Sequence, residues 1–236
     1  MGVLTRADII NRVSGSLSET PEKAIVVRPV VGGALQPRPG AASIDVHLGR
    51  HFVVTKRTSL PALQPYGESA EAERQLRRYQ EHFELPFGGE VTLHPRQFLL
   101  ASTLEFFRMP LDLVAQVIGR SSWGRAGLII ATATVVHPGY TGIITLEIEN
   151  LGEAPVTLRV GCSIGQLVFL QVANETGEQA ASHAECYRDS SYVAATKPSL
   201  GALGRMHGER ALLSSVGSPA TRSRAIQRMS RGASPE

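Results

Sequence analysis

Apolar and polar positions alternate most regularly in the second half of the chain, which predicts a protein built mainly from β-strands. Between Val91 and Val168 short apolar runs follow one another, separated by Pro-Gly, Gly and Asn turns. Few positions there repeat at the 3.6-residue spacing of a helix. Closely spaced strands of this kind favour a sandwich or a barrel, in which the sheet edges are paired or curled.

The clearest strand pattern is Thr141–Asn150, where apolar and polar side chains alternate. One face carries Ile144, Leu146 and Ile148, and the other carries Thr145, Glu147 and Glu149. Residues 154–161 form a second strand pattern, and residues 150–153 have the composition of a turn. We therefore expect these two strands to pair as a hairpin.

The first half of the chain predicts a short helix, a strand and a second helix. Thr5 and Asp8 have the arrangement of a helix N-cap, and an apolar stripe follows them. The segment Ser43–Gly49, of sequence SIDVHLG, alternates as a half-buried strand does, with Asp45 and His47 on its polar face. Residues 69–83 are rich in charge and place apolar residues at helical spacing, which predicts a peripheral surface helix.

The composition is that of an ordinary globular protein: 236 residues, 42% hydrophobic and 19% charged. The chain is basic only at its end. Residues 205–236 hold six arginines and two glutamates, a net of +4, which leaves about −1 of the total +3 for residues 1–204. We therefore predict one domain over residues 1–204, a disordered basic tail over residues 205–236, and no nucleic-acid partner.

No apolar run is long enough for a bilayer helix, and the first residues, MGVLTRADII, lack the pattern of a signal peptide. A cytoplasmic location and no membrane partner are the resulting expectations. The two cysteines, Cys162 and Cys186, are too few for a disulfide framework or a structural zinc site.

The stretch Gly119–Arg125, of sequence GRSSWGR, is the first candidate for chemistry. It combines two guanidinium groups, two hydroxyls and two glycines, which suit the binding of phosphate oxygens. A plain surface turn with solvated arginines is the competing interpretation. The second candidate is Glu147, a carboxylate among long apolar side chains that could transfer protons. The pattern alone favours a solvated polar face over this role.

A zinc-dependent deaminase is the third possibility, because His183-Ala184-Glu185 has the H-x-E form. Such enzymes also need a P-C-x-x-C motif for the metal. The chain contains no C-x-x-C, and Cys186 is its last cysteine. We therefore expect no zinc and no other metal site in the protein.

Taken together, several motifs resemble the dCTP deaminase/dUTPase family, and its dCTP deaminase branch in particular. They are SIDVHLG, LHPRQFLLASTLE, GRSSWGR, GLIIATATVVHPGYTG, ITLEIEN and IGQLVF, in the order that the family has them. The resemblance covers most of residues 1–200.

This resemblance implies a mainly β fold: a distorted, jelly-roll-like, dUTPase-like β-barrel with a short N-terminal helix and a peripheral helix. It also implies a homotrimer with active sites between subunits and a C-terminal segment over the bound nucleotide. The implied activity is zinc-independent hydrolysis of dCTP to dUTP and ammonia in pyrimidine deoxynucleotide metabolism. Mg²⁺ would arrive bound to the triphosphate.

The resemblance also implies roles for particular residues. Glu147 would activate the water, Ser121 would help to place that water, and Arg125 would steady Glu147 or the developing charge. The implied substrate-binding residues are Arg120, Ser122, Trp123, Gly124, His137, Thr145, Leu146 and Gln166. Tyr187, Tyr192 and Lys197 are approximate counterparts of the lid residues.

Two alternatives stay open: a dUTPase or bifunctional dCTP deaminase–dUTP diphosphatase, and a non-catalytic nucleotide-binding or regulatory relative. The turn Val136–Tyr140 bears on them, because His137 stands where the family has an aspartate. In dUTPases that aspartate is tied to the hydrolytic water and the sugar 3′-hydroxyl. The substitution therefore weakens the dUTPase alternative more than the deaminase one.

Overall fold

The computed structural model describes residues 2–14, 21–33, 35, 40–56, 74, 78–131, 135–172 and 195–198. The chain divides into two compact units, one of residues 1–57 and 80–201 and the other of residues 58–79 and 202–236. Only Arg74, Arg78 and Tyr79 of the second unit are described, and all three are helical. The predicted tail, residues 205–236, lies outside the described residues.

The first unit is built mainly from β-strands. Its helical elements are α1 (Arg6–Ser14), the 3-10 helix η1 (Pro21–Lys23) and α3 (Ser121–Arg125). Its strands are β1 (Val26–Arg28), β2 (Ser43–Thr55), β3 (Gln80–Glu84), β4 (Glu90–Leu93), β5 (Phe98–Arg108), β6 (Leu113–Gly119), β7 (Leu128–Ala131), β8 (Val135–Val136), β9 (Thr141–Asn150), β10 (Val156–Arg159) and β11 (Ser163–Gln171). No helix in this part of the chain is long and apolar enough to cross a membrane.

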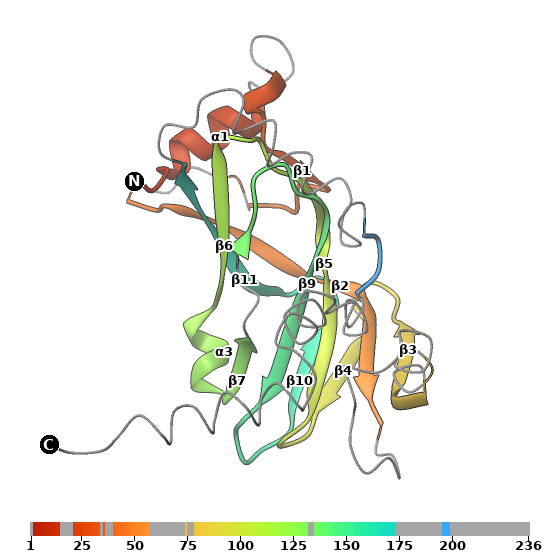
Figure 1. The fold of residues 1–236 in the computed structure, drawn as a ribbon. Helices are drawn as coiled ribbons and strands as arrows, with labels where there is room; N and C mark the ends of the chain where they lie inside the picture. Colours follow the sequence, from red (N-terminus) through yellow and green to blue (C-terminus); the bar gives the residue numbers. More distant parts are fainter. Residues whose placement is uncertain are drawn as a thin grey trace, which may run out of the picture. The chain divides into compact units, whose positions relative to one another are not determined.

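Nine of these strands form one curled sheet around the long strand β2 (Figure 1). The strand order is β7-β9-β5-β2-β11-β6-β8, with β1 on β5 and β3 on β2, and all the pairings are antiparallel. The sheet curls so far that β6 and β7, distant in this order, approach each other. A Cβ atom on Gly119 would lie 3.6 Å from Cδ1 of Ile130.

Strand β2 lies between β5 and β11 in the sheet, and Gly49 allows β5 to approach it closely. A Cβ atom at Gly49 would lie 2.2 Å from the Ser102 hydroxyl oxygen and 2.5 Å from the Thr103 carbonyl oxygen. The register between β2 and β5 shifts at this place, between Leu48 and Phe52. The glycine of the SIDVHLG motif therefore has a packing role.

The core lies inside the curl of the sheet. Its largest fully buried side chains include Phe52, Phe107, Phe169 and Leu146, each at most 1% exposed. Burying one such side chain stabilises the fold by about 1.5–3 kcal/mol. Helix α1 adds to this core through Ile9, and its N-terminus is capped as the sequence predicts. The Thr5 hydroxyl accepts from the Asp8 N–H, and the Asp8 carboxylate accepts from the Thr5 N–H, both at 3.2 Å.

The predicted hairpin between residues 141–150 and 154–161 is wrong, although both segments contain strands. Strand β9 pairs with β5 and β7, whereas β10 pairs with β4 in a separate two-stranded sheet. The buried Asn150 side chain holds the chain at this change of direction. Its amide nitrogen donates to the carbonyl oxygens of Leu93 and Ala154, each at 2.9 Å.

The peripheral helix predicted over residues 69–83 ends before Gln80. Residues 80–84 form β3, which pairs with β2, and the Phe83 ring stacks on Phe52 with 5.2 Å between centroids. Pairing with β2 therefore overrides the helical spacing in this part of the segment. Apart from Arg74, Arg78 and Tyr79, the earlier part lies outside the described residues.

Candidate active site

Strand β9 carries Glu147 on the face that the sequence predicts. Leu146 and Ile148 are buried, whereas Thr145, Glu147 and Glu149 are only half-buried. This confirms the alternation of apolar and polar positions along the strand.

The surroundings of Glu147 follow from the strand register. It lies opposite Ala131 of β7 and opposite Leu100 of β5, which in turn lies opposite Val53 of β2. Residues opposite one another in antiparallel strands share a face. Leu100 is 2% exposed and Val53 is 1% exposed. The Glu147 carboxylate therefore borders a buried apolar strip and is not part of an evenly solvated face.

Residues 121–125 of the GRSSWGR motif form the short helix α3. Arg120 precedes the helix in an extended conformation, and its carbonyl oxygen accepts from the backbone N–H groups of Trp123 and Gly124. Those two N–H groups are therefore used within the chain. Ser121 and Ser122 occupy the first turn and are exposed, as is Arg125. The binding roles of Trp123 and Gly124 stay predictions.

Asp45 joins two of the predicted phosphate contacts. Its Oδ1 accepts from Nη1 of Arg120 at 3.0 Å and from Nε2 of Gln166 at 3.1 Å. The side chain of Asp45 is 11% exposed, and that of Arg120 is 34% exposed. Because Asp45 is on β2, Gln166 on β11 and Arg120 at the end of β6, three neighbouring strands meet at this carboxylate.

Ser163, the first residue of β11, accepts hydrogen bonds from two residues of the GRSSWGR motif. Its hydroxyl accepts from Nη1 of Arg120 at 2.8 Å, and its carbonyl oxygen accepts from the indole N–H of Trp123 at 2.9 Å. We call Asp45, Arg120, Trp123, Ser163 and Gln166 the Asp45 cluster. Sequence reasoning missed Asp45 and Ser163 as site residues. The only signal for Asp45 was its place on the polar face of SIDVHLG.

The turn that carries His137 is tied to the start of β9. His137 is exposed, and its carbonyl oxygen accepts from the Tyr140 N–H at 3.2 Å. The Tyr140 hydroxyl donates to the carbonyl oxygen of Ile143. Burial raises the pKa of Tyr140 to about 12. Tyr140 is therefore a neutral anchor for this turn at ordinary pH.

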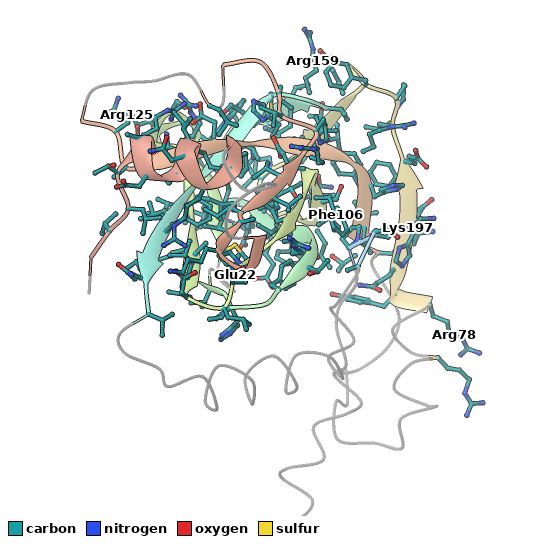
Figure 2. All side chains as sticks on the ribbon, turned by 90° about the horizontal axis from the view of Figure 1, so that it is seen from above. Glu22, Arg78, Phe106, Arg125, Arg159 and Lys197 are labelled. Carbon is teal, nitrogen blue, oxygen red and sulfur yellow. The ribbon has the colours of Figure 1, made fainter. Side chains whose placement is uncertain are left out.

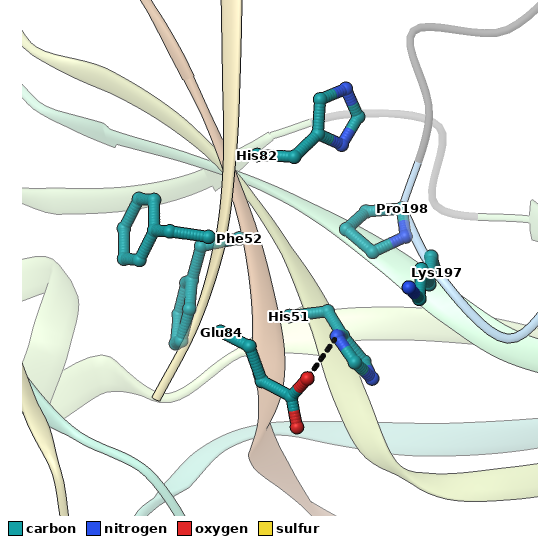
Figure 3. A pocket seen from close by; sticks show the side chains of 7 residues that line it. His51, Phe52, His82, Glu84, Lys197 and Pro198 are labelled. Atoms are coloured by element: carbon teal, nitrogen blue, oxygen red, sulfur yellow. Dashed lines mark ion pairs between the residues drawn. The ribbon is translucent and has the colours of Figure 1, made fainter. Parts of the chain in front are cut away.

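Lys197 is the one predicted lid residue that the structure describes, because Tyr187 and Tyr192 lie outside the described residues. It lines a pocket with Pro198 and with His51, Phe52, His82, Phe83 and Glu84 of β2 and β3 (Figure 3). The pocket volume is about 160 Å³. This is below the roughly 300–1,000 Å³ of sites for drug-sized ligands, so the pocket is too small for a whole nucleotide.

One chain brings some predicted site residues together and keeps others apart. Arg120 and Gln166 meet at Asp45, whereas Arg125 and Lys197 lie on opposite sides of the first unit (Figure 2). The strand register places Leu128, three residues after Arg125, opposite Asn150, and Glu147 lies three positions from Asn150 along β9.

Residues that could form a metal site are not grouped in the described part of the chain. No three His, Cys, Asp or Glu side chains come together there in a way that could hold a metal ion. His183 and Cys186 lie outside the described residues.

Comparison with known proteins identifies the family of this chain. Residues 12–172 match the family model described as dCTP deaminase-like. This chain belongs to the dCTP deaminase-like family. The dCTP deaminase of Halorubrum lacusprofundi is 40% identical over 171 residues, which are 72% of this chain and 77% of that protein. A relative from Halobacterium salinarum, named "dCTP deaminase, dUMP-forming", is 36% identical over 73% of this chain and 82% of its own length.

The fold also matches that family. The crystal structure of the 2′-deoxycytidine 5′-triphosphate deaminase from Agrobacterium tumefaciens aligns with a TM-score of 0.51 at 20% sequence identity. The alignment covers 84% of this chain and 54% of that one. The predicted mainly β fold and the predicted dCTP deaminase family are therefore confirmed for this chain.

Proposed function

We propose that this chain deaminates dCTP hydrolytically to dUTP and ammonia, without zinc, and that Glu147 is the general base. The observation that carries the proposal is the position of Glu147, half-buried on β9 beside the buried Leu100, in a chain of the dCTP deaminase-like family. A carboxylate at the edge of an apolar strip is suited to move a proton in a site that a bound base shields from water.

In the proposed reaction, Glu147 takes a proton from water while the water oxygen forms a bond to C4 of cytosine. Glu147 passes this proton to the ring nitrogen N3, where it stays, and C4 then carries a hydroxyl and the amino group. The hydroxyl proton is transferred through Glu147 to the amino group, the C4–N bond breaks, and ammonia leaves as the C4=O bond of uracil forms. Ser121 would place the water, and Arg125 would stabilise the negative charge that develops during attack.

The nucleotide would be held at both of its ends. Thr145 and Leu146, next to Glu147 on β9, would flank the base with their backbone groups, and His137 would contact the sugar. Arg120, Ser122 and Gln166 would bind the phosphates of the substrate, which arrives as its Mg²⁺ complex, and Trp123 and Gly124 would border them. Tyr187, Tyr192 and Lys197 would close over the nucleotide.

We further propose that the site forms between subunits of a homotrimer. One observation supports this. In one chain Arg125 and Lys197, both expected to act on the nucleotide, lie on opposite sides of the first unit. A neighbouring copy could bring such groups together, and closed symmetric assembly is usual for soluble oligomers.

A bifunctional enzyme that releases dUMP is the second candidate, because relatives at 36% and 40% identity are named dUMP-forming. Incubating the protein with dCTP and Mg²⁺ and measuring ammonia, dUTP, dUMP and diphosphate distinguishes the two. We expect equal amounts of ammonia and dUTP. Ammonia with dUMP and diphosphate would favour the bifunctional enzyme, and nucleotide binding without any product would overturn both.

A further inference from the structure

We propose that Asp45 is a positioning residue that holds Arg120 and Gln166 in place for the phosphates of the nucleotide. This inference rests on the proposed function. It assigns Asp45 no contact with the substrate and no part in proton transfer.

The geometry places a single oxygen atom at the centre of the cluster. Oδ1 of Asp45 accepts from Arg120 at 3.0 Å and from Gln166 at 3.1 Å, and Asp45 and Gln166 lie directly opposite each other on β2 and β11. Hydrogen bonds to an ionised acceptor are roughly twice as strong as neutral ones. One carboxylate oxygen on a rigid strand therefore fixes two long side chains.

The arrangement leaves part of the Arg120 guanidinium for a ligand. Both of its hydrogen bonds, to Asp45 and to Ser163, are made by Nη1. Arginine has donors on Nε, Nη1 and Nη2, and a phosphate is bound best by two of them in parallel. Within the described part of the chain, Nε and Nη2 of Arg120 make no hydrogen bond, so this edge is oriented and available.

Position and charge predict opposite effects when the carboxylate is lost. Asp45 contributes a negative charge beside a site for phosphates, so by charge alone its removal strengthens triphosphate binding. As a positioning residue, Asp45 orders the long side chains of Arg120 and Gln166 before the nucleotide binds. Without Asp45, binding must also order these two side chains, so its removal weakens triphosphate binding. The sign of the change in affinity decides between these effects.

Three substitutions separate position from charge. Asp45→Ala removes the acceptor, Asp45→Asn keeps an oxygen at the same place without charge, and Asp45→Glu keeps the charge but moves the oxygen by one methylene. We expect Asp45→Ala and Asp45→Glu to raise the KM and Kd for dCTP about tenfold, the worth of roughly one charged hydrogen bond. The kcat and the Kd for deoxycytidine, which has no phosphate, should stay within a factor of about two. Asp45→Asn, whose neutral oxygen accepts weaker hydrogen bonds from the same place, should raise the KM and Kd for dCTP less than Asp45→Glu does.

Asp112→Ala is the matched control, because it removes another half-buried Asp–Arg pair, that of Asp112 and Arg12 at 2.8 Å. It should leave the KM unchanged, and thermal unfolding of every variant separates folding losses from binding losses. If Asp45→Ala does not fold, the difference in the KM and Kd for dCTP between Asp45→Asn and Asp45→Glu still tests the role of Asp45. In an Arg120→Ala background, Asp45→Ala should cost clearly less affinity than it does alone.

Two results are distinguishable. A wild-type chain that neither binds dCTP nor releases ammonia from it overturns the proposed function and this role with it. A wild-type chain that binds dCTP, together with an Asp45→Ala or Asp45→Glu variant that binds it equally well or more tightly, overturns the role of Asp45 alone.

Discussion

The side chains of His47 and Glu105 meet inside the fold, where β2 lies next to β5. Nδ1 of His47 is 2.5 Å from Oε1 of Glu105, and the backbone N–H of His47 donates to Oε2 at 3.0 Å. Glu105 is 1% exposed and His47 is 7% exposed. Both carboxylate oxygens are therefore used, and His47, which the sequence places on the polar face of its strand, belongs to the interior.

Glu105→Ala should lower the free energy of unfolding by about 2–6 kcal/mol, because it leaves the buried His47 ring and the His47 backbone N–H without their acceptor, at about 1–3 kcal/mol each. Urea denaturation monitored by tryptophan fluorescence measures this loss. Glu90→Ala is the matched control, since it breaks the exposed pair of Glu90 and Arg159 at 2.6 Å and should cost no more than about 1 kcal/mol. Equal losses in the two variants would contradict the structural importance of the buried pair.

Tyr140 should make the protein less stable as the pH rises above 10. Its pKa is about 12 in the folded chain, above the usual 10.0 of tyrosine, so between these pH values the folded chain keeps a proton that the unfolded chain releases. Unfolding is then favoured by rising pH. Denaturation at about pH 9 and about pH 11 should show a larger loss for the wild type than for Tyr140→Phe. Parallel losses would show that Tyr140 is not the group responsible.

The faces of the strands could be predicted from the sequence, but their partners could not. Alternation along Thr141–Asn150 correctly predicts which side chains are buried, because that pattern depends only on the period of the strand. The alternation does not indicate which strands pair with one another. β10 joins β4 and not β9, and the side chain of Asn150, which supports this change of direction, is a single polar residue in the sequence.

Several residues of the candidate site could also be predicted from the sequence, but not which of them meet in the fold. The family motifs identify Arg120 and Gln166, but their meeting at Asp45 joins positions that are 75 and 121 residues apart in the chain. No local pattern encodes such a contact, because it depends on β2, β6 and β11 being neighbours in the sheet. The short helix α3 was missed for a related reason: glycine and serine disfavour helix interiors, and this helix is supported by Ser163 on another strand.

His137→Asp should add release of diphosphate to the activity of the enzyme. A carboxylate on this exposed turn can accept hydrogen bonds from the sugar 3′-hydroxyl and from a water near the phosphates, which an imidazole does less well. Diphosphate and dUMP formed from dUTP are the quantities to measure. His94→Asp, at another exposed turn, controls for the added charge. No gain in His137→Asp would remove the argument that this turn residue disfavours the dUTPase alternative.

The role of Glu147 is tested most directly by Glu147→Gln, which keeps the size of the side chain and removes its ability to accept a proton. Ammonia release from dCTP should fall by at least about a hundredfold, the usual contribution of a general base, while the Kd for dCTP changes little. The measurement is ammonia release at saturating dCTP, together with calorimetric binding of dCTP to the same preparation. Loss of ammonia release with binding retained is the expected result, and ammonia release at the wild-type rate would contradict the mechanism.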